Sequence, residues 1–129
     1  MNKVVPEHKH LIVRAEVNNP PKDPEWVKEW LTSLVSKIGM TILSGPHTAY
    51  VEQPGNAGVT GVVVIETSHI AIHVWDESNP ALMQLDVYTC GPFDMEIIFD
   101  EIEKMDPTKI EWKYLDREHG LNEVSKSIH

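Results

Sequence analysis

Hydrophobic residues recur at helical spacing in two segments of the chain. From Val27 to Ile38 they are separated by intervals of three and four residues, which places them on one face of a helix. Asp23 followed by Pro24 predicts where this helix begins, because aspartate caps free amide groups and proline fits the first turn. Gly39 predicts its end. The same spacing predicts a second amphipathic helix within residues 91–105.

Alternating or continuous β-branched runs predict strands between and around these helices. The predicted strands are residues 10–17, 40–43, 59–66, 69–75, 82–90 and 109–115. Prolines and glycines predict a long loop over residues 44–58, and the polar end from about Asp116 is predicted to fray. The element order predicts a single α+β domain over residues 1–129. It would be a two-layer α/β sandwich, with one antiparallel sheet covered on one face by both helices.

Charge and hydropathy narrow the class of protein. The formal net charge of −9 argues against nucleic acid or an anionic membrane as a partner, because both require a basic surface. No apolar run approaches the roughly 20 residues that span a bilayer. The first ten residues contain no apolar segment of the secretory type, so we expect a cytoplasmic protein.

Residues 66–75, ETSHIAIHVW, combine a β-strand pattern with side chains that can transfer protons or acyl groups. His69 and His73 are four residues apart, which suits a metal site on a helix. On a strand the same spacing separates them by about 13 Å, so this pair cannot share one metal ion. We therefore predict no metal site from these histidines.

Alternation divides this strand and the next one into two faces. One face is apolar and is expected to pack on the helices, and it consists of Ile70, Ile72, Val74, Leu85, Val87 and Thr89. The other is mixed and consists of His69, Ala71, His73, Trp75, Asp86, Tyr88 and Cys90. Each of these residues has an ordinary structural role in many proteins, so the pattern alone leaves the function open.

The order of residues in this region is more specific than their spacing. GVTGVVVIETSHIAIHVWDE, residues 58–77, followed by LDVYTCG, residues 85–91, closely resembles the prokaryotic S-adenosylmethionine decarboxylases. These are small pyruvoyl-dependent enzymes of polyamine synthesis. The resemblance covers about residues 9–115. It implies an α/β sandwich that forms a homodimer, and a product that supplies aminopropyl groups for spermidine synthesis.

The resemblance also implies that the chain cuts itself between Thr67 and Ser68. The products would be residues 1–67 and 68–129, and Ser68 would become a pyruvoyl group that forms a Schiff base with the substrate. His73 matches the histidine that removes a proton during this processing, and Thr60 stands where the family has a serine that assists it. No metal is required.

Four further residues acquire roles in turnover from the same resemblance. Cys90 matches the cysteine that protonates the substrate carbon after CO₂ leaves, and Glu77 matches the glutamate that holds the ribose hydroxyls. Trp75 occupies an aromatic position of the site. Tyr50 is expected to supply the ring that stacks on adenine.

Three departures from the family pattern keep other functions open. Thr67 replaces a glutamate, Asp76 replaces a proline, and the loop at residues 48–58 is longer. Asp76 and Glu77 would also attract a cationic side chain, so a pyruvoyl-dependent ornithine or arginine decarboxylase is one alternative. The other is an unprocessed, non-catalytic paralogue with a binding or regulatory role.

Overall fold

The computed structural model describes residues 8–128. The segment in which a secretory signal was sought lies mostly outside them. Within them no helix is long and apolar enough to cross a membrane. In chain order the elements are β1 (Lys9–Val17), α1 (Pro24–Lys37), β2 (Ile42–Val51), β3 (Gly58–Ile65), β4 (Ser68–Trp75), β5 (Ala81–Thr89), α2 (Met95–Glu103), β6 (Pro107–Asp116) and β7 (Glu123–Ile128).

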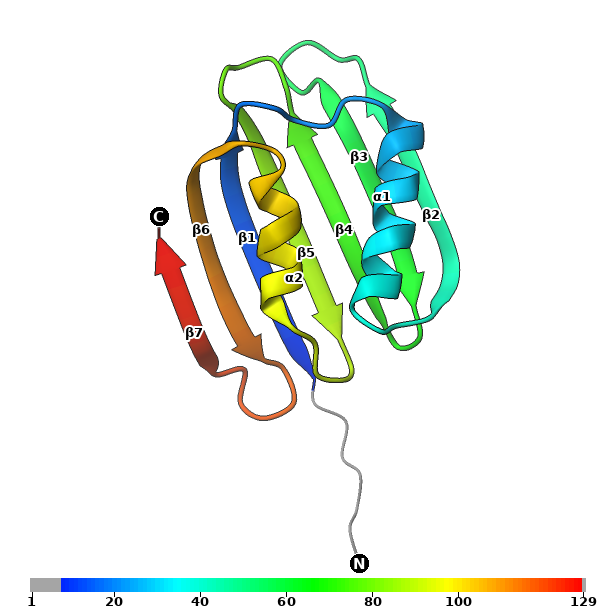
Figure 1. Cartoon of the computed structure of the whole chain (residues 1–129), viewed down its shortest axis with the longest axis vertical. Helices are drawn as coiled ribbons and strands as arrows, with labels where there is room; N and C mark the ends of the chain where they lie inside the picture. Colours follow the sequence, from blue (N-terminus) through cyan, green and yellow to red (C-terminus); the bar gives the residue numbers. More distant parts are fainter. Residues whose placement is uncertain (1–7, 129) are drawn as a thin grey trace, which may run out of the picture.

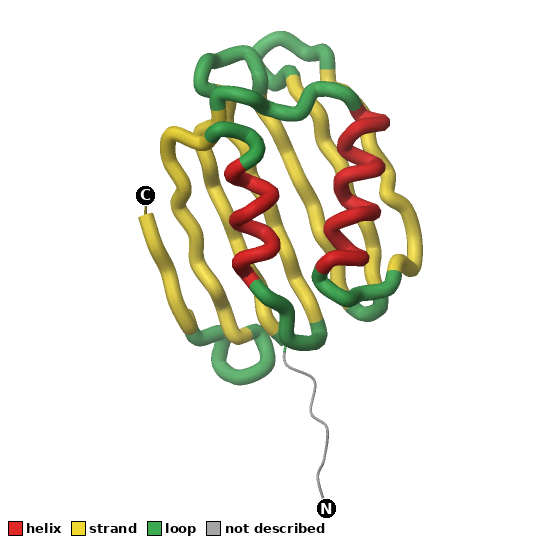
Figure 2. Tube along the Cα trace, viewed as in Figure 1, coloured by secondary structure: helices red, strands yellow, loops and turns green. Residues whose placement is uncertain are grey.

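The strands form one antiparallel sheet in the order β2-β3-β4-β5-β1-β6-β7. Both helices lie on the same face of this sheet (Figure 1), and the tube view shows the same two layers (Figure 2). The predicted α+β architecture is therefore confirmed. The opposite face, which we call the open face, carries no helix in the described part of the chain.

Helix α1 begins and ends where the sequence predicted. The Asp23 carboxylate accepts the Glu25 N–H at 3.0 Å, and Gly39 follows the helix with φ +77°. The helix packs closely on the sheet at Gly61, where a Cβ atom would lie 3.0 Å from the Val27 side chain. Glycine at position 61 thus allows the helix layer to approach the strands that carry the site.

The predicted loop over residues 44–58 was largely wrong. Strand β2 continues to Val51 and pairs with β3, so the loop covers only residues 52–57. Pro46 misled the prediction, because proline normally interrupts a sheet. Here it lies in an edge strand where the register shifts between Ser44 and His47, and such positions tolerate proline.

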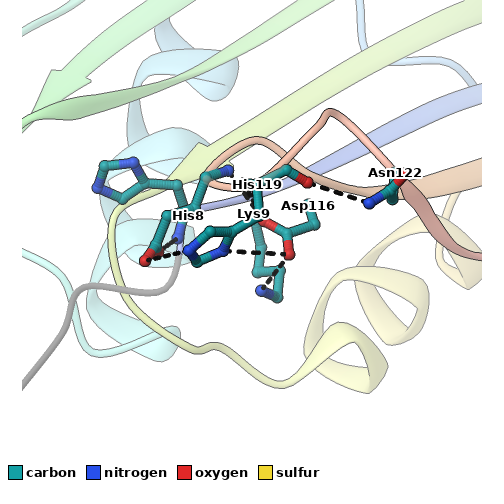
Figure 3. A network of polar contacts seen from close by, with 6 residues as sticks. His8, Lys9, Asp116, His119 and Asn122 are labelled. Carbon is teal, nitrogen blue, oxygen red and sulfur yellow. Dashed lines mark hydrogen bonds and ion pairs between the residues drawn. The ribbon is translucent and has the colours of Figure 1, made fainter.

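The predicted frayed end was also wrong, because β7 pairs with β6. Figure 3 shows the turn before β7 tied to the start of β1. Lys9 Nζ lies 3.9 Å from the Asp116 carboxylate, and Asn122 Nδ2 donates to the His119 carbonyl at 3.1 Å. An edge strand paired by its backbone needs few apolar side chains, so the hydrophobic pattern did not indicate it.

Candidate active site

A two-residue turn, Glu66–Thr67, joins β3 to β4, and Ser68 is the first residue of β4. The sequence pattern predicted that this strand begins at His69, one residue later than it does, and so left Ser68 in the turn. Thr67 has φ +62°, a left-handed conformation that is uncommon for a β-branched residue. Such a conformation costs roughly 1–3 kcal/mol. The peptide predicted to break therefore follows a residue held in an unfavourable conformation.

Three side-chain donors converge on the backbone carbonyl oxygen of Glu66. The Thr67 hydroxyl donates to it at 2.6 Å, and the Ser68 hydroxyl at 3.2 Å. The Cys90 thiol, directly after β5, donates to the same oxygen at 3.5 Å. The structure thus brings the predicted nucleophile and the predicted proton donor to one turn, although they are 22 residues apart in sequence.

Thr60 and His73 form a second group on the open face. They are directly paired between β3 and β4, and the Thr60 hydroxyl lies 2.5 Å from His73 Nδ1. The rings of His73 and Trp75 are 6.2 Å apart. Two shallow hollows of ≈ 270 and ≈ 420 Å³ flank His73, and Ala71 lines both of them.

Ser68 and His73, one from each group, lie on opposite faces of the sheet. Ser68 is 7% exposed and shares the helix-covered face with Ile70 and Ile72, whereas His73 is exposed on the open face. The two residues are also five positions apart along the strand, a distance of roughly 16 Å. Within one chain, His73 therefore cannot contact the Thr67–Ser68 peptide. Positions 68 and 73 differ by an odd number, so in a strand their side chains point to opposite faces. This signal was present in the sequence.

Glu77 and Trp75 contact the loop over residues 52–57, which sequence reasoning did not foresee. The Glu77 carboxylate accepts the backbone N–H groups of Gly55 at 3.0 Å and Ala57 at 3.1 Å. These hydrogen bonds lower the pKa of Glu77. The Trp75 indole N–H donates to Asn56 Oδ1 at 2.7 Å. Three residues of the loop, Gly55, Asn56 and Ala57, are thus hydrogen-bonded to the end of β4 and to Glu77 just beyond it.

Tyr50 is not brought together with Thr60 and His73. It pairs directly with Val59, a core residue, so its side chain leaves the sheet on the helix-covered face. Its hydroxyl donates to both Asp76 carboxylate oxygens, at 2.8 and 3.0 Å, and this hydrogen bond raises the pKa of Tyr50. Within one chain, Tyr50 and Asp76 therefore anchor each other away from the open face.

A cluster that the sequence analysis missed joins His10, His69 and Asp86 on the open face, with ligand atoms within 4.8 Å of one another. His10 Nε2 bonds Asp86, and Arg117 donates to His10 Nδ1 at 3.2 Å. Arginine can only donate, so Nε2 carries the ring proton. A metal-bound histidine would instead need an acceptor for its other N–H, which Arg117 cannot provide. The donor arrangement favours a hydrogen-bonded cluster over a metal site.

The electrostatics of Asp86 agree with this assignment. Burial raises the pKa of the Asp86 carboxyl, but the hydrogen bond from His10 and the nearby charges of His69 and Arg117 outweigh burial. The net effect lowers its pKa below the usual value. Asp86 is therefore a carboxylate that accepts a hydrogen bond from His10 and lies near the charges of its other neighbours.

Comparison with known proteins shows which family this chain resembles. A family model described as S-adenosylmethionine decarboxylase matches residues 9–118, from the start of β1 to just beyond the end of β6. The chain is 34% identical over 125 residues to the S-adenosylmethionine decarboxylase proenzyme of Methanococcus maripaludis strain C5, covering 92% of this chain and 93% of that protein. It is 38% identical over 84 residues to the proenzyme of the same name from Thermodesulfovibrio yellowstonii, covering 64% of this chain and 58% of that protein.

A solved structure is similar over almost its whole length. It is the crystal structure of the adenosylmethionine decarboxylase from Aquifex aeolicus VF5, with a TM-score of 0.69 and 28% sequence identity. The superposition covers 96% of this chain and 99% of that one. The similarity therefore extends through both layers of the fold.

Proposed function

The chain belongs to the S-adenosylmethionine decarboxylase family, and we propose that it cuts itself between Thr67 and Ser68 and then decarboxylates S-adenosylmethionine. The observation that carries this proposal is the β3–β4 turn. There the Ser68 hydroxyl and the Cys90 thiol both contact the backbone oxygen of Glu66. Thr67, which precedes the peptide bond expected to break, has φ +62°. The product would supply aminopropyl groups for spermidine synthesis. The cytoplasmic location stays a prediction.

The proposed cleavage uses atoms of the turn itself. The Ser68 hydroxyl oxygen attacks the Thr67 carbonyl carbon, and the C–N bond breaks as a C–O ester bond forms. A base then removes the Ser68 α-proton, so the ester C–O bond breaks and leaves a carboxylate on Thr67 and a double bond in residue 68. Water adds, ammonia leaves, and residue 68 becomes a pyruvoyl group.

Turnover would follow at the same position. The pyruvoyl carbonyl supplies an electron sink when the substrate amine is bound, as cofactor carbonyls do elsewhere. The contact of the Cys90 sulfur with the backbone oxygen of Glu66, at 3.5 Å and two residues before Ser68, supports the proposal that Cys90 returns a proton to the substrate carbon.

We also propose that the active form is a homodimer whose open faces pack together. Large apolar side chains remain exposed on this face, at 43% for Ile12 and 37% each for Val62 and Val64. With a two-fold axis that lies between the two packed sheets and runs perpendicular to β4, level with the point midway between positions 68 and 73, each His73 would face the Ser68 backbone of the other copy from the open side of the sheet. A second copy would thus supply the processing group that is out of reach within one chain.

Mixed dimers test this shared site. Ser68→Ala keeps His73 but has no nucleophile, and His73→Ala keeps the nucleophile but has no base. Neither variant alone should be cut at the wild-type rate. When the two are co-expressed with different tags, only the His73→Ala chain should gain normal cleavage, because its partner supplies His73. Cleavage of that chain at the same rate alone and in the mixture would contradict the proposal.

Glu77→Gln distinguishes the proposed substrate from the alternatives. A carboxylate can accept both ribose hydroxyls, and glutamine keeps part of that capacity while losing the charge. We expect about a tenfold loss of kcat/KM on S-adenosylmethionine. An ornithine or arginine decarboxylase that used Glu77 to read a cation would lose most of its activity. The measurement is kcat/KM of wild type and variant on all three amino acids; a wild type that prefers ornithine or arginine would contradict the proposal.

A further inference from the structure

We infer that Asn56 is a positioning residue for the substrate, acting through Trp75. The inference rests on the proposed function, since it assigns the loop over residues 52–57 to the substrate site of that enzyme. The Asn56 side-chain oxygen accepts the Trp75 indole N–H at 2.7 Å, the shortest of the contacts between this loop and the end of β4. Asn56 belongs to the segment in which this sequence departs from the family pattern.

The hydrogen bond restricts how the Trp75 ring can lie. An indole has a single N–H and no acceptor, so one well-placed oxygen determines the direction in which its polar edge points. Trp75 extends from the open face beside His73, with ring centroids 6.2 Å apart. Without Asn56, the indole N–H would have to seek water, and the ring would lose the contact that selects one orientation.

The loop that carries Asn56 is itself held in place by backbone contacts. Ala57 is bonded on both sides, since its N–H donates to Glu77 at 3.1 Å and its carbonyl accepts the Asp76 N–H at 3.0 Å. At Gly58 a Cβ atom would lie 1.7 Å from the Val74 carbonyl oxygen, so only glycine permits this approach to β4. Asn56 is therefore presented to Trp75 from a fixed backbone.

The loop orients Glu77 without using up its carboxylate. Each carboxylate oxygen has two lone pairs, and Gly55 and Ala57 each occupy one on a different oxygen. One acceptor site on each oxygen remains for a pair of ligand hydroxyls. The same loop thus orients the Trp75 ring through Asn56 and the Glu77 carboxylate through its backbone N–H groups.

The first test is Asn56→Ala, assayed on processed protein with S-adenosylmethionine. Loss of one neutral hydrogen bond should raise KM by about three- to tenfold. The value of kcat per cleaved chain should change less than twofold, because Asn56 contacts no reacting atom. Asn56→Asp keeps the oxygen acceptor and should restore most of the wild-type KM. Gln53→Ala is the matched control, since it alters the same loop at an exposed position and should leave KM unchanged.

The decisive step repeats Asn56→Ala in a Trp75→Phe background. If Asn56 acts through the indole N–H, Asn56→Ala should leave KM unchanged once Trp75→Phe has removed that N–H. The two effects on KM would then be strongly non-additive. A general loosening of the loop would instead raise KM by the same factor in both backgrounds, which would overturn the inference. An unchanged KM in Asn56→Ala alone would also overturn it. Failure of the proposed function would be recognised separately, as an uncut or inactive wild-type protein.

Discussion

Ser68→Ala is expected to remain a single uncut chain of 129 residues, with no decarboxylation above the uncatalysed background. Alanine has no oxygen to attack the Thr67 carbonyl, so neither the ester nor the later elimination can form. Ser68 is only 7% exposed and the substitution removes one atom, so the fold should persist. Denaturing gel electrophoresis together with a thermal unfolding curve measures both consequences.

The matched control for this variant is Ser78→Ala. Ser78 is an exposed serine in the turn between β4 and β5, and its hydroxyl donates to the Pro80 carbonyl at 3.2 Å. It should be cut like the wild type. If Ser68→Ala is cut and Ser78→Ala is not, the nucleophile has been assigned to the wrong residue.

Cys90→Ala is expected to separate maturation from turnover. The thiol contacts the Glu66 carbonyl at 3.5 Å, but the bond-breaking atoms of the cleavage belong to Thr67 and Ser68. The variant should therefore be cut into two chains. Decarboxylation should fall by about 10²–10⁴-fold, the range typical of a positioned proton donor. The measurement is CO₂ release per cleaved chain.

Cys90→Ser provides the comparison for that result. Serine preserves the size and a donor group but is a much weaker acid than a thiol, so its activity should lie between that of wild type and Cys90→Ala. Normal turnover in Cys90→Ala would assign the proton donor elsewhere. An uncut Cys90→Ala would show that the thiol is needed for maturation.

Where side chains alternate or recur regularly, the sequence predicted the fold well. The helix from Pro24 and the buried face that includes Ile70 and Ile72 both appear where expected. The predictions failed at the two edge strands, β2 and β7, because backbone pairing defines them. The spacing of apolar residues does not indicate which strand lies beside an edge strand. In β2, Pro46 in addition suggested a loop.

For the candidate site, too, some features could be predicted from the sequence and others could not. The resemblance identified Ser68, Cys90 and His73, but it did not show that His73 lies on the other face of the sheet. The sequence also gave no sign that Glu77 binds backbone N–H groups of the loop, because such bonds depend on how the chain turns between β2 and β3. Contacts between side chain and backbone follow from the fold and have no residue pattern of their own.

The intact mass of the purified wild-type protein shows whether the chain cuts itself between Thr67 and Ser68. We expect two chains, residues 1–67 and residues 68–129. The second should be lighter by one ammonia than the same fragment with an N-terminal serine, because residue 68 has become a pyruvoyl group. A single chain with the full mass of all 129 residues after prolonged incubation would contradict self-cleavage and favour the non-catalytic alternative.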